Sequence, residues 1–202
     1  MTTDALVHVI DDDDAMRDSL SFLLDSAGFE TRTYDSATVF LEEASRLSGG
    51  CIVTDVRMPG MNGLEMCRHL KAMHIDLPII MITGHGDVAL AVEAMKAGVA
   101  DFLEKPFDDE ALLRAIRSVL AQARPGAPPQ SSGPFQAFLA SLSPRETEVL
   151  RGVVDGKANK VIAFELGISP RTVEVYRANV MTKTGASSLS QLIRMALTAG
   201  FA

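Results

Sequence analysis

Residues 51–55 read CIVTD, a short apolar run that ends in a carboxylate. A run of this kind, rich in Val and Ile, is typical of a buried strand. In the first 124 residues such runs alternate with longer stretches of helical periodicity. This alternation predicts an α/β doubly wound five-stranded parallel sheet wrapped by helices. The predicted strands are Ala5–Ile10, Glu30–Tyr34, Cys51–Thr54, Pro78–Ile82 and Asp101–Leu103.

A different pattern begins after residues 122–134, QARPGAPPQSSGP, which concentrate Pro, Gly and Ser. This composition does not support a regular helix and indicates an interdomain linker. Beyond it no strand is predicted, and four short helices are expected at Arg145–Asp155, Lys160–Leu166, Pro170–Thr182 and Leu189–Ala199. We therefore predict a first domain at 1–124, a linker at 125–134 and an all-α domain at 135–202.

The two halves carry opposite charge. Residues 1–124 hold 11 Lys and Arg against 21 Asp and Glu, whereas residues 125–202 hold 8 against 5. An acidic half repels nucleic acid and suits a hard cation, whereas a mildly basic helical half suits phosphates. No apolar run of about eighteen residues and no signal-peptide pattern is present, which predicts a cytoplasmic protein without membrane contact. Cys51 and Cys67 are expected to be buried thiols.

Polar residues stand where the predicted strands end. Because ligands of doubly wound sheets bind outside the carboxyl ends of the strands, we expect these side chains to converge. They are Asp11, Asp12, Asp55, Thr83 and Lys105. The neighbouring Asp13 and Asp14 are expected to be solvated, with one of them capping the first helix.

Converging carboxylates repel one another, so this cluster requires a cation. Mg2+ is the natural candidate because it prefers oxygen ligands and keeps phosphate oxygens in its coordination shell. The hydroxyl of Thr83 and the ammonium of Lys105 supply a donor and a charge for phosphoryl oxygens. The pattern therefore predicts phosphoryl transfer, with Asp55 as the nucleophile that becomes an aspartyl phosphate.

The motifs around these residues resemble the receiver domain of two-component response regulators. They are VIDDDDAMRDSL at 9–20, VTDVRMPGMNGLE at 53–65, MITGHGD at 81–87 and FLEKPF at 102–107. The resemblance implies a flavodoxin-like fold and phosphorylation of Asp55 by a sensor histidine kinase. It implies metal binding by Asp11, Asp12, Asp55 and the backbone carbonyl of Arg57. It also implies a cis peptide bond before Pro106.

The resemblance further implies a conformational switch. A phosphoryl dianion on Asp55 favours a state with Thr83 drawn inward, and Phe102 occupies the position of the family's switch aromatic. We expect the phosphorylated receiver to form a homodimer through a face containing Val88, Val92 and Lys96.

Residues 159–173, NKVIAFELGISPRTV, predict a helix, a tight turn at Gly167 and a second helix. Ser169 is the expected cap and Pro170 the first helical residue, which together make a helix-turn-helix. Val173, Tyr176 and Val180 should pack inward. The residues expected to enter a DNA major groove are Arg171, Glu174, Val175 and Ala178. Expected phosphate contacts are Lys160, Thr172, Arg177 and Lys183.

Three motifs resemble the LuxR-type four-helix domain: LSPRETEVL at 142–150, residues 157–183, and SLSQLIRMAL at 188–197. Joined to this receiver, they resemble response regulators of the FixJ type. This implies phosphorylation-dependent activation of transcription with RNA polymerase as a partner, and nitrogen-fixation genes under low oxygen as targets. Tyr176 stands where many relatives have His, and Glu174 is acidic on the presumed reading face, which leaves the recognised base sequence open.

Two alternatives compete with this interpretation. A phosphatase of the haloacid-dehalogenase type also uses an Asp nucleophile, Mg2+, Thr and Lys, but its nucleophile follows the first strand, which points to Asp11 and leaves the C-terminal half without a role. A DNA-binding protein whose receiver dimerises without phosphate is the other alternative, and the complete acidic pocket argues against it. We therefore expect a regulator and not an enzyme.

Overall fold

The computed structural model describes residues 6–47, 49–84, 88–123, 138–186 and 188–201. Its contacts divide the chain into two compact units, residues 1–85 with 97–128 and residues 86–96 with 129–202. The predicted linker at 125–134 lies outside the described residues, so its bounds stay a prediction. In the described part of the chain, no helix is long and apolar enough to cross a membrane.

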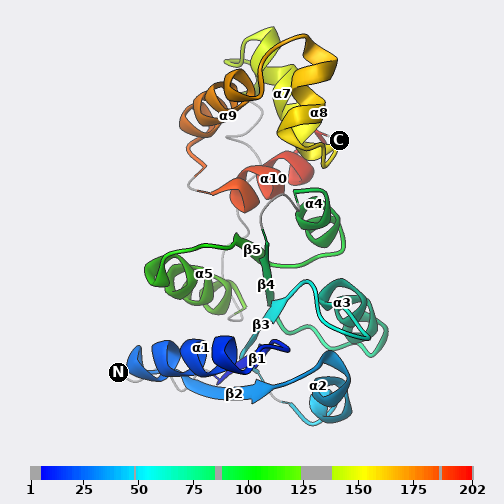
Figure 1. Ribbon diagram of the computed structural model, residues 1–202, viewed down its shortest axis with the longest axis vertical. Coiled ribbons are helices and arrows are strands. Elements are labelled where there is room, and N and C mark those ends of the chain that lie inside the picture. Colours follow the sequence, from blue (N-terminus) through cyan, green and yellow to red (C-terminus); the bar gives the residue numbers. More distant parts are fainter. Residues whose placement is uncertain (1–5, 48, 85–87, 124–137, 187, 202) are drawn as a thin grey trace. The chain divides into compact units, whose positions relative to one another are not determined.

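The first unit is built on five parallel strands in the order β2-β1-β3-β4-β5. The strands are β1 (Leu6–Ile10), β2 (Glu30–Tyr34), β3 (Cys51–Asp55), β4 (Ile79–Thr83) and β5 (Asp101–Glu104). The helices in this half of the sequence are α1 (Asp14–Ser26), α2 (Ala37–Ala44), α3 (Gly63–Ala72), α4 (Val88–Lys96) and α5 (Asp109–Gln122). Helices α1 and α5 cover one face of the sheet, and α2 and α3 cover the other (Figure 1). The predicted fold class is confirmed.

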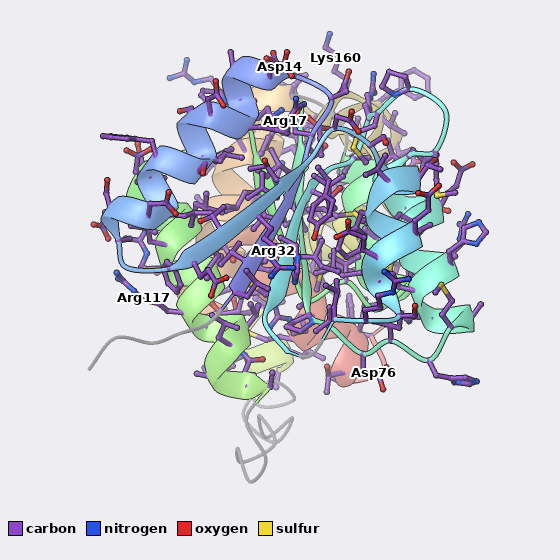
Figure 2. All side chains as sticks on the ribbon, turned by 90° about the horizontal axis from the view of Figure 1, so that it is seen from below. Asp14, Arg17, Arg32, Asp76, Arg117 and Lys160 are labelled. Carbon is purple, nitrogen blue, oxygen red and sulfur yellow. The ribbon has the colours of Figure 1, made fainter. Side chains whose placement is uncertain are left out.

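The strands agree with the prediction to within a residue at the described ends, and the small differences matter for the site. β3 continues to Asp55 and β4 to Thr83, because Asp55 pairs with Ile82 and Thr83 with Glu104 across the sheet. Both candidate residues are therefore held by strand pairing. Asp14 and Arg17 lie at the end of the sheet where these strands finish, and Asp76 lies at the opposite end (Figure 2).

Apolar strands buried on both faces supply the core of the first unit, as expected for an all-parallel sheet. On one face of the sheet, fully buried strand residues pack against side chains of α1 and α5; they are Val7, Val9, Val53 and Ile80. Cys51 and Cys67 are free and buried, as predicted. Burial raises the pKa of the Cys51 thiol to about 12.

The second unit contains α7 (Pro144–Val154), α8 (Asn159–Leu166), α9 (Pro170–Thr184) and α10 (Leu189–Thr198), close to the predicted helices. Helix α8 ends at Gly167 in the left-handed conformation, with φ of 65°, which glycine adopts without strain. The Ser169 side chain accepts a hydrogen bond from the backbone of Thr172 and caps α9, with Pro170 following. The core of this unit is formed by Leu150, Val154, Val180, Ala186, Leu192 and Ala196.

His8 is a polar residue in the middle of the first core. Its side chain is fully buried on β1 against the rings of Tyr34 and Phe40, and its Nδ1 is hydrogen-bonded to the Tyr34 hydroxyl at 3.2 Å. Nε2 has no hydrogen-bond partner among the described residues. Burial and the nearby charge of Arg32 lower the pKa of His8 from 6.5 to about 4.

This histidine makes the first unit sensitive to acid. Because the pKa of His8 is lower in the folded chain, only the unfolded chain takes up its proton as the pH falls from 6.5 to about 4. Across that window the wild type should lose about 3 kcal/mol of unfolding free energy relative to His8→Leu. Urea unfolding at several pH values, followed by methyl NMR signals of the first unit, measures this difference. An equal acid dependence of both proteins would contradict it.

Candidate functional site

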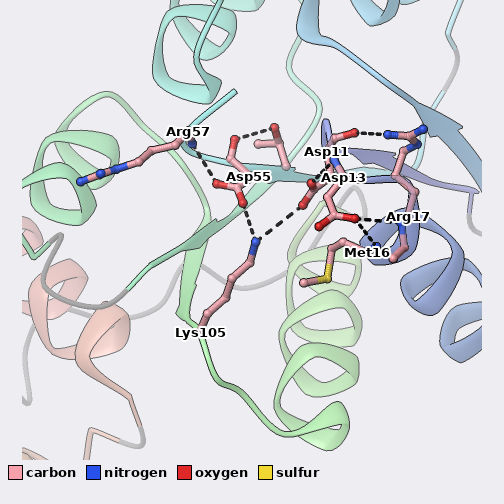
Figure 3. A network of polar contacts seen from close by, with 9 residues as sticks. Asp11, Asp13, Met16, Arg17, Asp55, Arg57 and Lys105 are labelled. Carbon is pink, nitrogen blue, oxygen red and sulfur yellow. Dashed lines mark hydrogen bonds and ion pairs between the residues drawn. The ribbon is translucent and has the colours of Figure 1, made fainter. Parts of the chain in front are cut away.

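Three charged side chains meet at the carboxyl end of the sheet, one at the end of β3 and two in the turns after β1 and β5 (Figure 3). Lys105 Nζ donates a 2.5 Å hydrogen bond to Asp55 Oδ2 and lies 3.7 Å from Asp11 Oδ2. The side chains of Asp11 and Asp55 are 3% and 14% exposed, so this is a largely desolvated triad. An ammonium between two carboxylates offsets the repulsion that their burial would otherwise impose.

Asp11 is fixed by the turn that leads from β1 into α1. Its Oδ1 accepts a hydrogen bond from the backbone N–H of Asp13 at 2.9 Å, and its carbonyl oxygen accepts one from Arg17 Nη1 at 2.7 Å. Asp13 caps α1 through its side chain, and exposed Asp14 pairs with Arg17. The expectation that one of these two aspartates caps the helix is confirmed.

Asp55 is fixed by the loop that follows β3. Its Oδ1 accepts a 2.8 Å hydrogen bond from the backbone N–H of Arg57, and the loop returns so that Gly63, the first residue of α3, donates to the Val56 carbonyl. A Cβ at Gly63 would lie 2.5 Å from the carbonyl oxygen of Asp55. Only glycine permits this approach of helix and strand.

Thr83 and Lys105 come from β4 and from the turn after β5. Thr83 is 2% exposed, and its carbonyl oxygen accepts a 2.8 Å hydrogen bond from the backbone N–H of Lys105. The Lys105–Pro106 peptide bond is cis, as the resemblance implied. Phe102, on β5 opposite Met81, is 7% exposed.

The electrostatics of the triad follow from burial and proximity. Burial lowers the pKa of Lys105, but the hydrogen bond to Asp55 and the charges of Asp55 and Asp11 outweigh this effect and raise it overall. Burial raises the pKa of Asp11, and the Asp13 N–H and the charge of Lys105 oppose that rise only in part. The carboxylates therefore favour the charged form of Lys105, whereas burial favours the neutral form of Asp11.

The predicted metal ligands are only partly assembled. Asp12 is exposed, and within the described residues no three His, Cys, Asp or Glu side chains form a group able to hold a metal ion. However, the buried Asp11 Oδ2 accepts no hydrogen bond from any described group, and Asp55 Oδ2 lies beside the same ammonium. A buried acceptor without a donor fits a hard cation, since oxygen ligands of this kind are those that Mg2+ binds.

The second unit presents the predicted reading face on α9. Val173 and Val180 are buried, Tyr176 is half-buried, and the four residues expected in the groove are exposed: Arg171, Glu174, Val175 and Ala178. Lys160 is exposed at the start of α8, and the Thr172 hydroxyl is hydrogen-bonded to Ser169.

The other two expected phosphate contacts are engaged within the unit. Arg177 Nη1 donates to Asn159 Oδ1 at 2.8 Å. Lys183 Nζ donates to Glu146 Oε2 at 2.7 Å.

The expected dimer face lies on α4. There Lys96 is exposed and Val92 is buried, whereas the side chain of Val88 lies outside the description.

Sequence reasoning missed three residues that support these sites. Arg17 and Gly63 hold the backbones of Asp11 and Asp55, and Glu146 holds Lys183. Two of them carried a local signal. Arg17 follows Asp14 by one helical turn, and Glu146 completes the S-x-x-E capping box with Ser143. The closeness of Gly63 to Asp55 carried none, because it depends on the path of the loop.

A doubly wound sheet with this acidic site, joined to a helix-turn-helix unit, defines a phosphoacceptor receiver with a DNA-binding domain. Residues 7–117 match the response regulator receiver domain family, and residues 140–196 match the family of bacterial regulatory proteins of the luxR type. The chain belongs to the two-component response regulators with a LuxR-type DNA-binding domain. The receiver implies a sensor histidine kinase as partner, and the family is one of transcriptional regulators.

Its relatives specify the type. The chain is 56% identical to the transcriptional regulatory protein FixJ of Bradyrhizobium diazoefficiens over 99% of this chain and 98% of that protein. It is 50% identical to FixJ of Rhizobium meliloti over 98% of each. It is 44% identical to the response regulator protein TodT of Pseudomonas putida, over 95% of this chain and 85% of that one. The crystal structure of full-length FixJ from B. japonicum matches all of both chains with 55% identity and a TM-score of 0.60. The resemblance to the FixJ type is confirmed.

The close approach at Gly63 yields a prediction. In Gly63→Ala the new Cβ meets a backbone oxygen that belongs to β3, so either α3 or Asp55 must move. We expect a loss of about 1–3 kcal/mol in unfolding free energy. Thermal unfolding measures this loss. Gly84→Ala is the matched control, because its Cβ would meet nothing within 4 Å. Equal stability of the two variants would show that the loop absorbs the clash.

Proposed function

We propose that the chain is switched by phosphorylation of Asp55 and that phosphorylation promotes dimerisation and DNA binding. The observation that carries this proposal is the half-buried Lys105 ammonium between Asp55 and Asp11 at the carboxyl edge of the sheet. A phosphoryl group brings anionic oxygens to a place where the cationic donor Lys105 already stands.

In the chemical step, a carboxylate oxygen of Asp55 attacks phosphorus while the bond from phosphorus to the donor breaks. The donor is the phosphorylated histidine of the sensor kinase, and its imidazole nitrogen leaves with the electron pair of that bond. Lys105 must exchange its hydrogen bond to Asp55 for one to a phosphoryl oxygen. The Arg57 N–H on Asp55 Oδ1 keeps the carboxylate oriented meanwhile.

The group that completes this site is Mg2+, which would neutralise the phosphoryl oxygens. We assign its ligands to Asp11, Asp12, Asp55 and the backbone carbonyl of Arg57. The buried Asp11 Oδ2, which accepts no hydrogen bond from a described group, supports the first of these. Exposed Asp12 must turn toward the site or act through water, which Mg2+ commonly retains.

The phosphate is reported by Thr83 and Phe102. Among the described residues, the Thr83 hydroxyl donates a long 3.4 Å hydrogen bond to the Gly84 carbonyl, so a phosphoryl oxygen is a better acceptor for it. Phe102, buried on the neighbouring strand, follows into the space that Thr83 leaves. The resulting change favours a homodimer through Val88, Val92 and Lys96. Because Val92 is buried, its participation requires a rearrangement of its surroundings.

DNA is read by α9. Its exposed side chains, Arg171, Glu174, Val175 and Ala178, meet base edges, while Lys160 and Thr172 meet phosphates. One copy buries a small interface, so two copies on a pseudo-palindromic promoter are needed for specificity. The FixJ type further supports activation through RNA polymerase, nitrogen-fixation genes under low oxygen, and a cytoplasmic location.

Replacement of the acceptor tests the phosphorylation. After incubation with acetyl phosphate and Mg2+, intact mass should show a phosphoryl group on the wild type and none on Asp55→Asn, because an amide is not a nucleophile for phosphorus. Size exclusion should show dimer for the wild type alone. Dimerisation of both would favour the phosphate-independent receiver.

Replacement of the reporter separates phosphorylation from its consequence. Thr83→Ala retains Asp55, Asp11 and Lys105, so it should gain the phosphoryl group in the same mass measurement. Without the hydroxyl that the phosphate attracts, it should remain largely monomeric in size exclusion. A phosphorylated variant that dimerises as the wild type does would remove Thr83 from the switch.

A further inference from the structure

Lys183 lies at the end of the helix that reads DNA, but its ammonium points into its own domain. Nζ donates to Glu146 Oε2 at 2.7 Å and lies 3.3 Å from the Ser141 carbonyl oxygen. Ser141 precedes α7, and Glu146 lies in its first turn. The contact therefore joins the last turn of α9 to the first turn of α7 across 37 residues of sequence.

Glu146 is a buried carboxylate with a second fixed partner. Its side chain is 5% exposed, whereas that of Lys183 is 40% exposed. The same Oε2 accepts a 2.7 Å hydrogen bond from the backbone N–H of Ser143, and the Ser143 hydroxyl accepts one from the Glu146 N–H, which completes a capping box. The hydrogen bond from Lys183, with that from Ser143, lowers the pKa of Glu146. Glu146 is thus charged, and moving Lys183 away would leave that buried charge without its cationic partner.

Few side chains of α9 are fully buried. Of its 15 residues Val173, Val180 and Thr184 are buried, and Thr184 uses its hydroxyl on the Val180 carbonyl. Half-buried Tyr176 and Met181 add to this packing, and Arg177 donates to Asn159 of α8 in the middle of the helix. The ion pair of Lys183 is a directional contact beyond the second valine, at the C-terminal end of α9.

We propose that Lys183 is a positioning residue of the DNA reader, which sets the orientation of α9 against α7 through buried Glu146, and is not a phosphate contact. This inference rests on the proposed DNA contacts of α9. In this role Lys183 raises the affinity for DNA by holding α9 in the orientation in which residues 171–178 meet the base edges together. A true phosphate contact contributes through released counterions.

Salt dependence separates the two roles. The wild-type full chain, treated with acetyl phosphate and Mg2+, first selects a duplex from a random-sequence DNA pool. Affinity for that duplex is then measured over a range of KCl for Glu146→Gln, Lys183→Met, Lys183→Arg and the control Lys160→Met. Circular dichroism establishes that each variant is folded at the assay temperature.

We expect Glu146→Gln, which keeps the lysine and removes a negative charge, to weaken binding about tenfold at every salt concentration with the wild-type slope. Lys183→Met should behave alike, and Lys183→Arg should recover part of the loss. Lys160→Met should flatten the slope by about 0.9.

Four results would overturn the proposal. Unweakened binding by Glu146→Gln would show that Glu146 does not position the helix. A slope flattened by about 0.9 in Lys183→Met would make Lys183 a phosphate contact. Unchanged affinity of both variants would leave the pair with a role in stability alone. Failure of the wild type to select any duplex would overturn the proposed DNA binding itself, and this inference with it.

Discussion

The ammonium of Lys105 holds two carboxylates together at the edge of the sheet, and the receiver site depends on this interaction. Asp11 and Asp55 are both largely buried, and two desolvated carboxylates beside one ammonium would repel each other without that counter-charge. Lys105 offsets enough of this repulsion for the chain to fold. Asp11 Oδ2 nevertheless accepts no hydrogen bond from a described group, and the pKa of Asp11 is raised. Added positive charge, or a movement of Lys105, therefore changes the electrostatic energy of the site. A phosphoryl dianion at such a site changes the net charge around Lys105 and so favours a different arrangement of these side chains.

The two units use the same physical device for different ends. In the receiver, Lys105 pairs with a carboxylate that must later react, so the pair has to be exchangeable. In the DNA-binding unit, Lys183 pairs with a carboxylate that is also bound by a helix cap, so the pair is fixed at both ends. The difference lies in which oxygens of the acid are used. At Asp55 the lysine binds Oδ2 and the Arg57 N–H binds Oδ1, whereas at Glu146 the lysine and the Ser143 N–H share Oε2.

Much of this architecture is readable from local sequence. The alternation of apolar runs with helical periods predicts the sheet, Gly167 and Ser169 predict the turn and the cap of the second unit, and Asp13 was foreseen as a possible cap. These features depend on neighbours within a few residues, where geometry is nearly fixed by residue type. The convergence of Asp11, Asp55 and Lys105 is also predictable, because parallel strands end at one edge.

The sequence by itself determined the fold class, the strand ends at which chemistry gathers, and the resemblance to FixJ-type regulators. The tertiary structure decided which partner each charge takes. It placed Asp12 in solvent, turned Arg17 onto the Asp11 carbonyl, brought Gly63 against Asp55 and gave Lys183 to Glu146. The physical reason is the distance along the sequence over which each interaction is decided. Backbone conformation follows from nearby residues, whereas the partner of a long flexible side chain is set by which distant groups the folded chain brings within a few ångströms.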